Sequence, residues 1–169
     1  MPPPVPVSPA GVPLADYGSR LLAHLIDTVL LGVLSAIVFV PSFFLIVSHA
    51  PFADEADPNP LTVLGFIFLI EAGFLVFVLA LWYLYAVEWM HRSGQTLGKR
   101  IMNIRVVPLD PRLRLTRLTA FKRYAAEFLP SILVPFYTLI DDLWPLWDRP
   151  FQQALHDKAA QTVVVKVSA

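Results

Sequence analysis

The sequence contains no cysteine and few charged side chains. Without cysteine, a disulfide framework and a thiolate metal site are both excluded. Asp, Glu, Lys and Arg together make up 15% of the 169 residues, whereas about 25% is usual in soluble domains. Hydrophobic residues make up 56%, and the mean hydropathy is +0.61. A chain of this length and composition is expected to form one domain embedded in a membrane.

Basic residues are absent from the loop between the first two apolar runs, where Asp54, Glu55 and Asp57 cluster. Nine of the 13 Lys and Arg residues lie instead between residues 92 and 123. Basic loops stay in the cytoplasm. We therefore expect a protein of the cell (plasma or inner) membrane whose N-terminus and 92–123 loop are cytoplasmic. The same rule accounts for the basic stretch without a nucleic-acid partner.

The first apolar run, from Leu21 to Val40, is long enough to cross a bilayer, which requires about 20 residues in a helix. It begins beside Arg20 and contains His24 and Asp27. Because these residues lie four and three positions apart, they share one face of a helix. An ionised aspartate at that depth costs roughly 3 kcal/mol unless a partner neutralises it. We expect Asp27 to find such a partner on its own helix or in the cytoplasmic loop.

The second apolar run extends from Leu61 to Met90, and Glu71 interrupts it well inside. Glu71 is either a protonated or hydrogen-bonded structural carboxyl or a group that contacts an ion. A third apolar segment, Phe128 to Trp144, contains Pro130 and Pro135. It either crosses the membrane as a third span or forms a broken, re-entrant hairpin that returns the C-terminus to the cytoplasm.

Two short β-branched segments favour the return. Ile104–Val107 and Thr162–Val167 are typical of strands, and an isolated strand beside a membrane would leave its edges unpaired. We expect the two to pair in a small cytoplasmic sheet, which requires both on one side of the membrane. Thr116–Phe128 is typical of an amphipathic helix at the lipid interface, with Arg123 and Glu127 as an ion pair on its polar side.

Two further segments are expected to be structural. Residues 1–15 are rich in proline and predict a disordered tail. The stretch Gly94-Gln-Thr-Leu-Gly98-Lys99-Arg100 differs from a phosphate-binding loop, which needs four residues between its glycines and a hydroxyl after its lysine. We expect it to be a corner whose Lys99 and Arg100 can reach lipid phosphates or the acids near the returning segment.

Three motifs, taken together, resemble the RDD family of small membrane proteins. They are Arg20 with Asp27 in the first apolar helix, Gly94–Arg100 after the second, and Leu155-His-Asp157-Lys near the end. The resemblance covers residues 16 to 167. The family is named for one arginine and two aspartates, and the resemblance implies that Arg20, Asp27 and Asp157 are those residues. It implies little about function, since ion transport is associated with only some members.

The expected fold is an all-α membrane protein with two transmembrane helices and a Pro-broken third hydrophobic segment, re-entrant or spanning. An interfacial amphipathic helix and a two-stranded cytoplasmic sheet complete it. The expected parts are a disordered tail at 1–15 and an RDD-like membrane domain at 16–169, with helix 1 at about 19–47, helix 2 at about 61–90, the basic loop at 91–123, the third hydrophobic segment at about 124–147 and a C-terminal segment at 148–169.

Two functions remain open. The first is an ion or proton transport component in which Asp27 and Glu71 contact the ion. Because two or three spans cannot enclose a pathway, transport requires a homo-oligomer or a membrane partner. The alternative is a non-transporting membrane adaptor or assembly factor that binds a cytoplasmic partner or anionic lipid. The candidate polar residues are Arg20, His24, Asp27, Glu71 and Asp157, with Lys99, Arg100, Asp141 and Asp142 as secondary candidates.

An enzyme is the least supported class. Ser35 and Ser131 have no partner identifiable by motif, and the HExxH zinc motif is absent. His156 and Asp157 form one adjacent pair, which alone is no metal or catalytic signature. We therefore expect no enzymatic activity, no cofactor and no metal. For Arg20 and Asp27 a purely structural interpretation also stands, in which they form an Arg–Asp pair that pins helices together.

Overall fold

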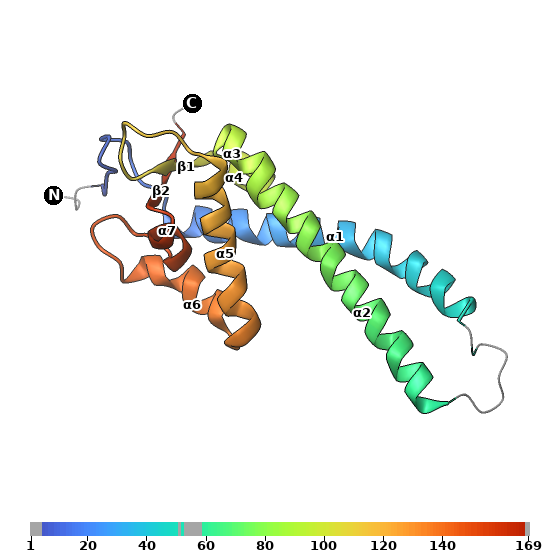
Figure 1. Ribbon diagram of the computed structural model, residues 1–169. Coiled ribbons are helices and arrows are strands. Elements are labelled where there is room, and N and C mark those ends of the chain that lie inside the picture. The colour runs from blue at the N-terminus through green and yellow to red at the C-terminus, as the bar shows by residue number, and fades with distance from the viewer. Residues whose placement is uncertain (1–4, 51, 53–58, 168–169) are drawn as a thin grey trace. The chain divides into compact units, whose positions relative to one another are not determined.

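A computed structural model describes residues 5–50, 52 and 59–167 (Figure 1). The acidic loop residues Asp54, Glu55 and Asp57 lie outside the described residues. The chain divides into two compact units. The first, which we call the head unit, comprises Met1–Asp27 with Tyr83–Ala169, and the second, the two-helix unit, comprises Thr28–Trp82.

Two long apolar helices are present, as the sequence predicted. Helix α1 extends over Tyr17–Ser48 and helix α2 over Pro60–Tyr83. Pro41 lies inside α1, which continues for two further turns rather than ending there. Both helices are long and apolar enough to cross a membrane, and only 11% and 0% of their most apolar windows are buried. Apolar side chains that find so few protein neighbours suggest a membrane protein.

Within the two-helix unit, aromatic side chains join the two helices. The rings of Phe39 and Phe74 lie 4.0 Å apart between centroids, and Phe39 also contacts Phe43. Beside these rings lies an apolar groove of about 400 Å³, where Gly73 has no heavy atom within 4 Å of the position a Cβ would take. The contacts within this unit are thus almost entirely apolar.

The head unit contains the remaining elements in short segments. In chain order they are a π-helical turn η1 (Leu84–Trp89), α3 (Met90–Ser93), α4 (Leu97–Ile101), β1 (Ile104–Pro108), α5 (Arg117–Leu133), α6 (Tyr137–Leu143), a 3-10 turn η2 (Trp144–Leu146), α7 (Leu155–Ala159) and β2 (Thr162–Lys166). Its apolar core joins residues from the start of α1, from η1, from both strands and from α5, among them Ala23, Val87, Ile104, Ala120 and Val164. Helix α5 packs against α7, η1 and α3.

The predicted strand pairing is confirmed. Strands β1 and β2 form an antiparallel sheet in which Val106 lies opposite Val164. Strand β1 follows the Gly94–Arg100 corner closely, whereas β2 ends the described chain (Figure 1). The long segment between them therefore leaves the sheet and returns to it.

The described part of the proline-rich tail is not disordered, contrary to expectation. Leu14 forms a bridge with Val165, and the amide of Ala15 donates to the carbonyl of Val164. Leu14 and Ala15 are buried. The free edge of β2 has unpaired backbone groups that the tail can hydrogen-bond. Leu14 and Ala15 become buried by packing against this edge. Residues 1–4 of the expected tail lie outside the described residues.

The third apolar segment is broken at Pro135, the second of its two prolines. Pro130 lies inside α5, and the break falls at Val134–Phe136, where Phe136 has φ of 63°. The Tyr137 hydroxyl donates back to the carbonyl of Ala126 at 3.0 Å, which holds α6 against α5. The segment is therefore a helical hairpin. Many apolar side chains on it are exposed, among them Leu129, Ile132, Leu133, Phe136, Leu139, Ile140 and Trp147.

Candidate functional site

The Asp27 carboxylate is buried and saturated with hydrogen bonds. The Tyr85 hydroxyl donates to Oδ1 at 2.6 Å, and the backbone amide of Gly98 donates to the same oxygen at 2.7 Å. The Thr96 hydroxyl donates to Oδ2 at 2.5 Å, and the Lys99 ammonium lies 3.9 Å from it. Charge-assisted bonds of this kind offset the desolvation of a carboxylate. The expectation that Asp27 would find a partner on its own helix or in the basic loop is confirmed, and its partners come from the loop and from Tyr85.

The Gly94–Arg100 segment is the corner that makes this contact. Gly94 has φ of 71° at the end of α3, a conformation that glycine adopts without strain. Thr96 then caps α4 by accepting from the amide of Lys99. A Cβ on Gly98 would lie 2.2 Å from the carbonyl oxygen of Ala23 and 2.8 Å from the Asp27 carboxylate. Only glycine lets this backbone approach α1 so closely.

Lys99 and Arg100 have different surroundings. Burial lowers the pKa of the Lys99 ammonium, and the nearby Asp27 carboxylate opposes that effect. Lys99 therefore contacts Asp27 rather than the acids near the returning segment that the sequence suggested, whereas Arg100 is exposed.

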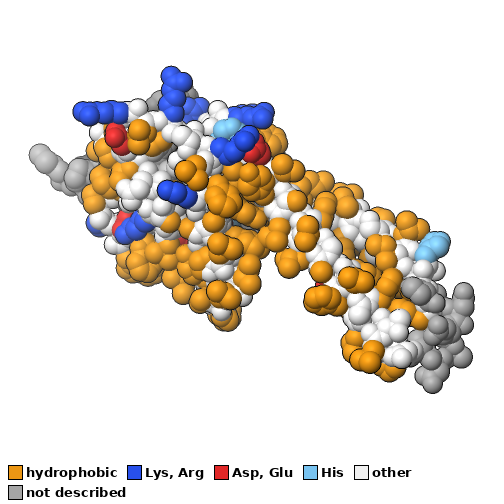
Figure 2. Space-filling view, in the orientation of Figure 1, with side chains coloured by type: hydrophobic (Ala, Val, Ile, Leu, Met, Phe, Trp, Pro, Cys, Tyr) orange, Lys and Arg blue, Asp and Glu red, His pale blue; other side chains and the backbone are white. Residues whose placement is uncertain are grey.

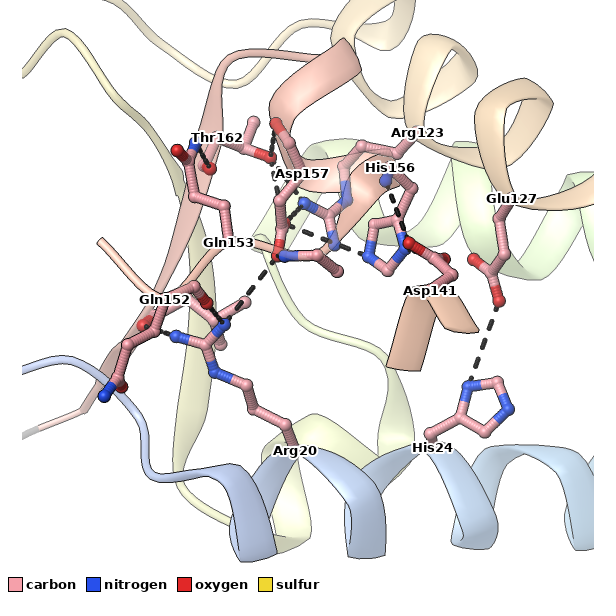
Figure 3. Close-up of polar contacts among 12 residues, drawn as sticks. Arg20, His24, Arg123, Glu127, Asp141, Gln152, Gln153, His156, Asp157 and Thr162 are labelled. Carbon is pink, nitrogen blue, oxygen red and sulfur yellow. Dashed lines mark hydrogen bonds and ion pairs between the residues drawn. The ribbon is translucent and has the colours of Figure 1, made fainter. Parts of the chain in front are cut away.

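A second cluster, which we call the clasp, surrounds Asp157 (Figure 3). One Asp157 oxygen accepts from Arg123, and the other accepts from the amide of Ala154 at 3.2 Å and lies 3.8 Å from Arg20. Arg123 also donates to the Thr162 hydroxyl. Asp157 is 1% exposed and Arg123 4%. Burial opposes ionisation of Asp157, but the two arginines and His156 outweigh it and hold the pKa of this carboxyl well below its usual range.

Arg20 joins three parts of the chain through backbone carbonyls. Its guanidinium donates to Gln152 at 2.5 Å, to Val164 at 3.1 Å and to Ala15 at 3.1 Å. Figure 3 shows the Arg20 side chain leaving α1 toward Gln152 and Asp157. Arg20 thus ties the start of α1 to β2 and to the segment before α7.

His156 links the clasp to α6. Its Nδ1 lies 2.5 Å from the Asp141 carboxylate, whose other oxygen accepts from the His156 amide at 3.1 Å. Asp141 is 0% exposed. Burial and Arg123 act to lower the pKa of His156, but Asp157 and the hydrogen bond to Asp141 outweigh them, and the net shift is upward. The folded state therefore favours the imidazolium form.

A third cluster, the His24 cluster, consists of His24, Glu127 and Asp142. His24 Nδ1 lies 3.9 Å from the Glu127 carboxylate, and Nε2 lies 3.7 Å from that of Asp142. The three side chains come from α1, α5 and α6 and are all partly exposed. Burial and the nearby carboxylates raise the pKa of Asp142, while His24 opposes the shift. The side chains of this cluster are open to solvent, whereas the carboxylates of Asp27 and Asp157 are buried.

Glu71 stands apart in α2, within the two-helix unit. Its side chain is exposed, and it makes no hydrogen bond or ion pair with any residue that the structure describes. It lies among exposed apolar neighbours on the helix such as Ile67, Phe68 and Leu75. A carboxyl on such an apolar surface is stabilised either by protonation or by a partner from another molecule.

The structure revises the relations that the sequence suggested. Arg20 does not pair with Asp27: it contacts Asp157, while Asp27 contacts Thr96, Gly98 and Lys99. The expected Arg123–Glu127 ion pair is wrong as well. Arg123 turns inward to Asp157, and Glu127 faces His24.

Several partners were missed because their residue types are common. Tyr85 and Thr96 donate to the Asp27 carboxylate, and Arg123 and Thr162 donate to that of Asp157, which lies 3.9 Å from His156. Because Arg123 lies on the polar side of the amphipathic pattern of residues 116–128, no period in the sequence indicated its burial. Among the described residues, no group of three or more His, Asp or Glu side chains is placed to hold a metal ion.

A known protein family matches most of the chain. Curated proteins and solved structures give no match to the chain. The sequence profile of the RDD family matches residues 14–161, a range that includes the Gly94–Arg100 corner and both saturated carboxylates. This match covers most of the chain, and the protein therefore belongs to the RDD family.

Proposed function

We propose that this protein is a proton or cation transport component of the membrane that acts as a homo-oligomer or with a membrane partner, and that it is not an enzyme. In this proposal the Asp27 site and the clasp hold the head unit together. The His24 cluster and Glu71 are the groups that exchange protons.

The observation that carries the proposal is the partial exposure of the His24 cluster. Histidine is the side chain whose ordinary pKa lies nearest to neutrality, and carboxylates beside it can take up or release its proton. His24 faces two carboxylates at 3.7 and 3.9 Å. Asp27 and Asp157, by contrast, already accept at least two hydrogen bonds each and face fixed cations. Protonating either carboxylate would remove the interactions that stabilise its charge in the buried site.

The oligomer is required by the size of the apolar unit. Two helices cannot enclose a polar pathway, and Glu71 is exposed among apolar side chains without a partner in the described chain. A carboxyl at membrane depth faces a bundle interior or a cavity in most proteins. Association through the α2 surface that carries Glu71 would supply such surroundings.

We infer that the N-terminus, the 92–123 loop and the C-terminus are cytoplasmic. The basic residues of the head unit and the pairing of β1 with β2 support this orientation. The chain has no native cysteine, so a single cysteine at residue 169 reports on it directly. Labelling by an impermeant reagent added outside intact cells would contradict the inference.

Proton flux into liposomes tests the transport proposal. Full-length protein is reconstituted with a pH-sensitive dye inside, and a potassium gradient with valinomycin supplies the driving potential. We expect wild-type vesicles to acidify faster than protein-free vesicles. Vesicles with His24→Leu should fall to the protein-free rate, while Lys122→Ala, which removes an exposed charge from the same helix as Glu127, should leave the rate unchanged.

Absence of wild-type flux at verified orientation and folding would overturn this proposal. The adaptor function would then be favoured, in which the head unit binds a cytoplasmic partner or anionic lipid. The protein would still contain the Asp27 site and the clasp, because these depend only on internal contacts.

A further inference from the structure

Helix α2 continues through η1 and α3, so that the second candidate membrane span extends over Pro60–Ser93, and a hollow of about 490 Å³ lies at the end of this span. It is lined by Leu84, Glu88 and Trp89 of η1, Arg92 and Ser93 of α3, and Arg100 of α4. All six belong to the head unit. They bring two guanidinium groups and a tryptophan together where the apolar helix gives way to the polar corner.

The positive charge of this hollow is not neutralised within the described chain. Arg92 and Arg100 are exposed, and neither guanidinium has a hydrogen bond or ion pair with a described residue. Glu88 is the one acid among the lining residues, but Arg117 already holds both of its oxygens at 2.7 and 2.8 Å. Two cationic groups therefore remain available to an anion.

The other side of the hollow is apolar. Leu84 is 58% exposed and Trp89 46%, and both lie in the last turns of the span. Tryptophan is enriched where lipid chains meet headgroups. Figure 2 shows blue basic side chains gathered on the head unit, while the two-helix unit is covered in orange hydrophobic side chains. The hollow thus combines a surface for acyl chains with cations for a phosphate.

We propose that Arg92 and Arg100 bind the phosphate of an anionic phospholipid headgroup, with Leu84 and Trp89 against its acyl chains. Guanidinium groups match phosphate oxygens in geometry and charge. Ser93 contributes no hydroxyl to the ligand, because its Oγ already donates to the Gln95 carbonyl. The site is independent of proton transport and would serve a transporter or an adaptor alike. A free phosphate shares the chemistry, but it would leave the exposed Leu84 and Trp89 surface uncovered.

Lipid retention measured by native mass spectrometry tests the proposal. Full-length protein is extracted from nanodiscs that contain equal amounts of phosphatidylglycerol and phosphatidylcholine. We expect the wild type to retain phosphatidylglycerol preferentially. In the double variant Arg92→Gln, Arg100→Gln, this preference should fall on the order of tenfold, because each basic residue beside an anionic lipid strengthens its binding substantially.

The control removes the same charge outside the hollow, through Arg105→Gln with Arg112→Gln, and should keep the preference within about twofold. An equal loss in the control would overturn the proposal in favour of diffuse charge. Equal retention of both lipids by the wild type would overturn it as well. Loss of the preference in millimolar inorganic phosphate would overturn the assignment to a lipid. Arg92→Lys with Arg100→Lys, which keeps the charge, should retain an intermediate preference.

Discussion

At the scale of single residues, Arg20, Asp27 and Asp157, which the resemblance to the RDD family singled out, serve two separate sites. Asp27 accepts from the Gly94–Arg100 corner, whereas Arg20 and Asp157 meet in the clasp. Sequence spacing predicted that Asp27 needed a partner and that the loop could supply it, because a buried carboxylate must be compensated. It could not predict that Arg20 would reach Asp157, since helical spacing gives information only about near neighbours in the chain.

Gly98 offers a direct test of the corner. A Cβ there would lie 2.2 Å from the backbone carbonyl of Ala23, which cannot move without α1. We expect Gly98→Ala to lower the free energy of unfolding by roughly 2–3 kcal/mol, measured by denaturant or thermal unfolding in detergent. Gly65→Ala is the matched control, because no heavy atom lies within 4 Å of its Cβ position. Equal stability of the two variants would contradict the close contact.

The clasp predicts non-additive energetics. Either Arg123→Met or Asp157→Asn leaves a buried charge without its partner and should cost roughly 3–5 kcal/mol, whereas the double variant should cost clearly less than the sum. The exposed pair Arg117 and Glu88 provides the control cycle, with an expected coupling below about 1 kcal/mol. Unfolding in detergent measures both cycles. Additive losses for Arg123 and Asp157 would show that the two side chains do not interact.

The clasp also predicts a pH dependence. The pKa of His156 is raised from 6.5, so its stabilising contribution is complete below that value and is lost as pH rises through the folded-state pKa. The pKa of Asp157 is lowered from 3.8, so its contribution is present above that value. The unfolding temperature of the wild type should therefore exceed that of His156→Gln by more at about pH 6 than at about pH 9. A difference that grows with pH would contradict the assignment.

At the scale of elements, hydropathy and β-branching predicted the two long helices and the strand pair. Both signals are strong, since each rests on a run of similar residues. The tail was misjudged because its prolines oppose helix but not an edge contact, and Leu14 is buried by pairing with β2 and by packing in the small apolar cluster around Val163 and Val165. The inward turn of Arg123 on α5 was missed because an arginine on an amphipathic helix is usually exposed.

The break between α5 and α6 predicts an unusual response to glycine. Phe136 has φ of 63°, which is strained for a residue with a Cβ, and its side chain is exposed. Phe136→Gly should therefore change the free energy of unfolding by less than about 0.5 kcal/mol or increase it. Leu139→Gly, at an exposed position inside α6, should lower it by roughly 1 kcal/mol. Equal losses would indicate one continuous helix through both positions, as in a plain third span.

At the scale of the whole molecule, composition predicted a membrane protein, and the RDD family match with the two apolar helices agrees with that prediction. Charge placement predicted an orientation that labelling must still test. The division into a head unit that contains the buried carboxylates and an apolar two-helix unit was not predictable, because it depends on which distant carboxylates and cations meet. No periodic pattern in the sequence indicates which residues far apart in the chain will pair.

The central claim is that internal contacts saturate Asp27, while the His24 cluster carries proton exchange. Its most direct test compares Asp27→Asn with His24→Gln in two measurements, the unfolding temperature in detergent and the proton flux per folded molecule in liposomes. We expect Asp27→Asn to lower the unfolding temperature and to retain flux, because it weakens three hydrogen bonds of the corner. His24→Gln should keep the unfolding temperature and lose flux. Flux that disappears in a well-folded Asp27→Asn variant but persists in His24→Gln would contradict the claim.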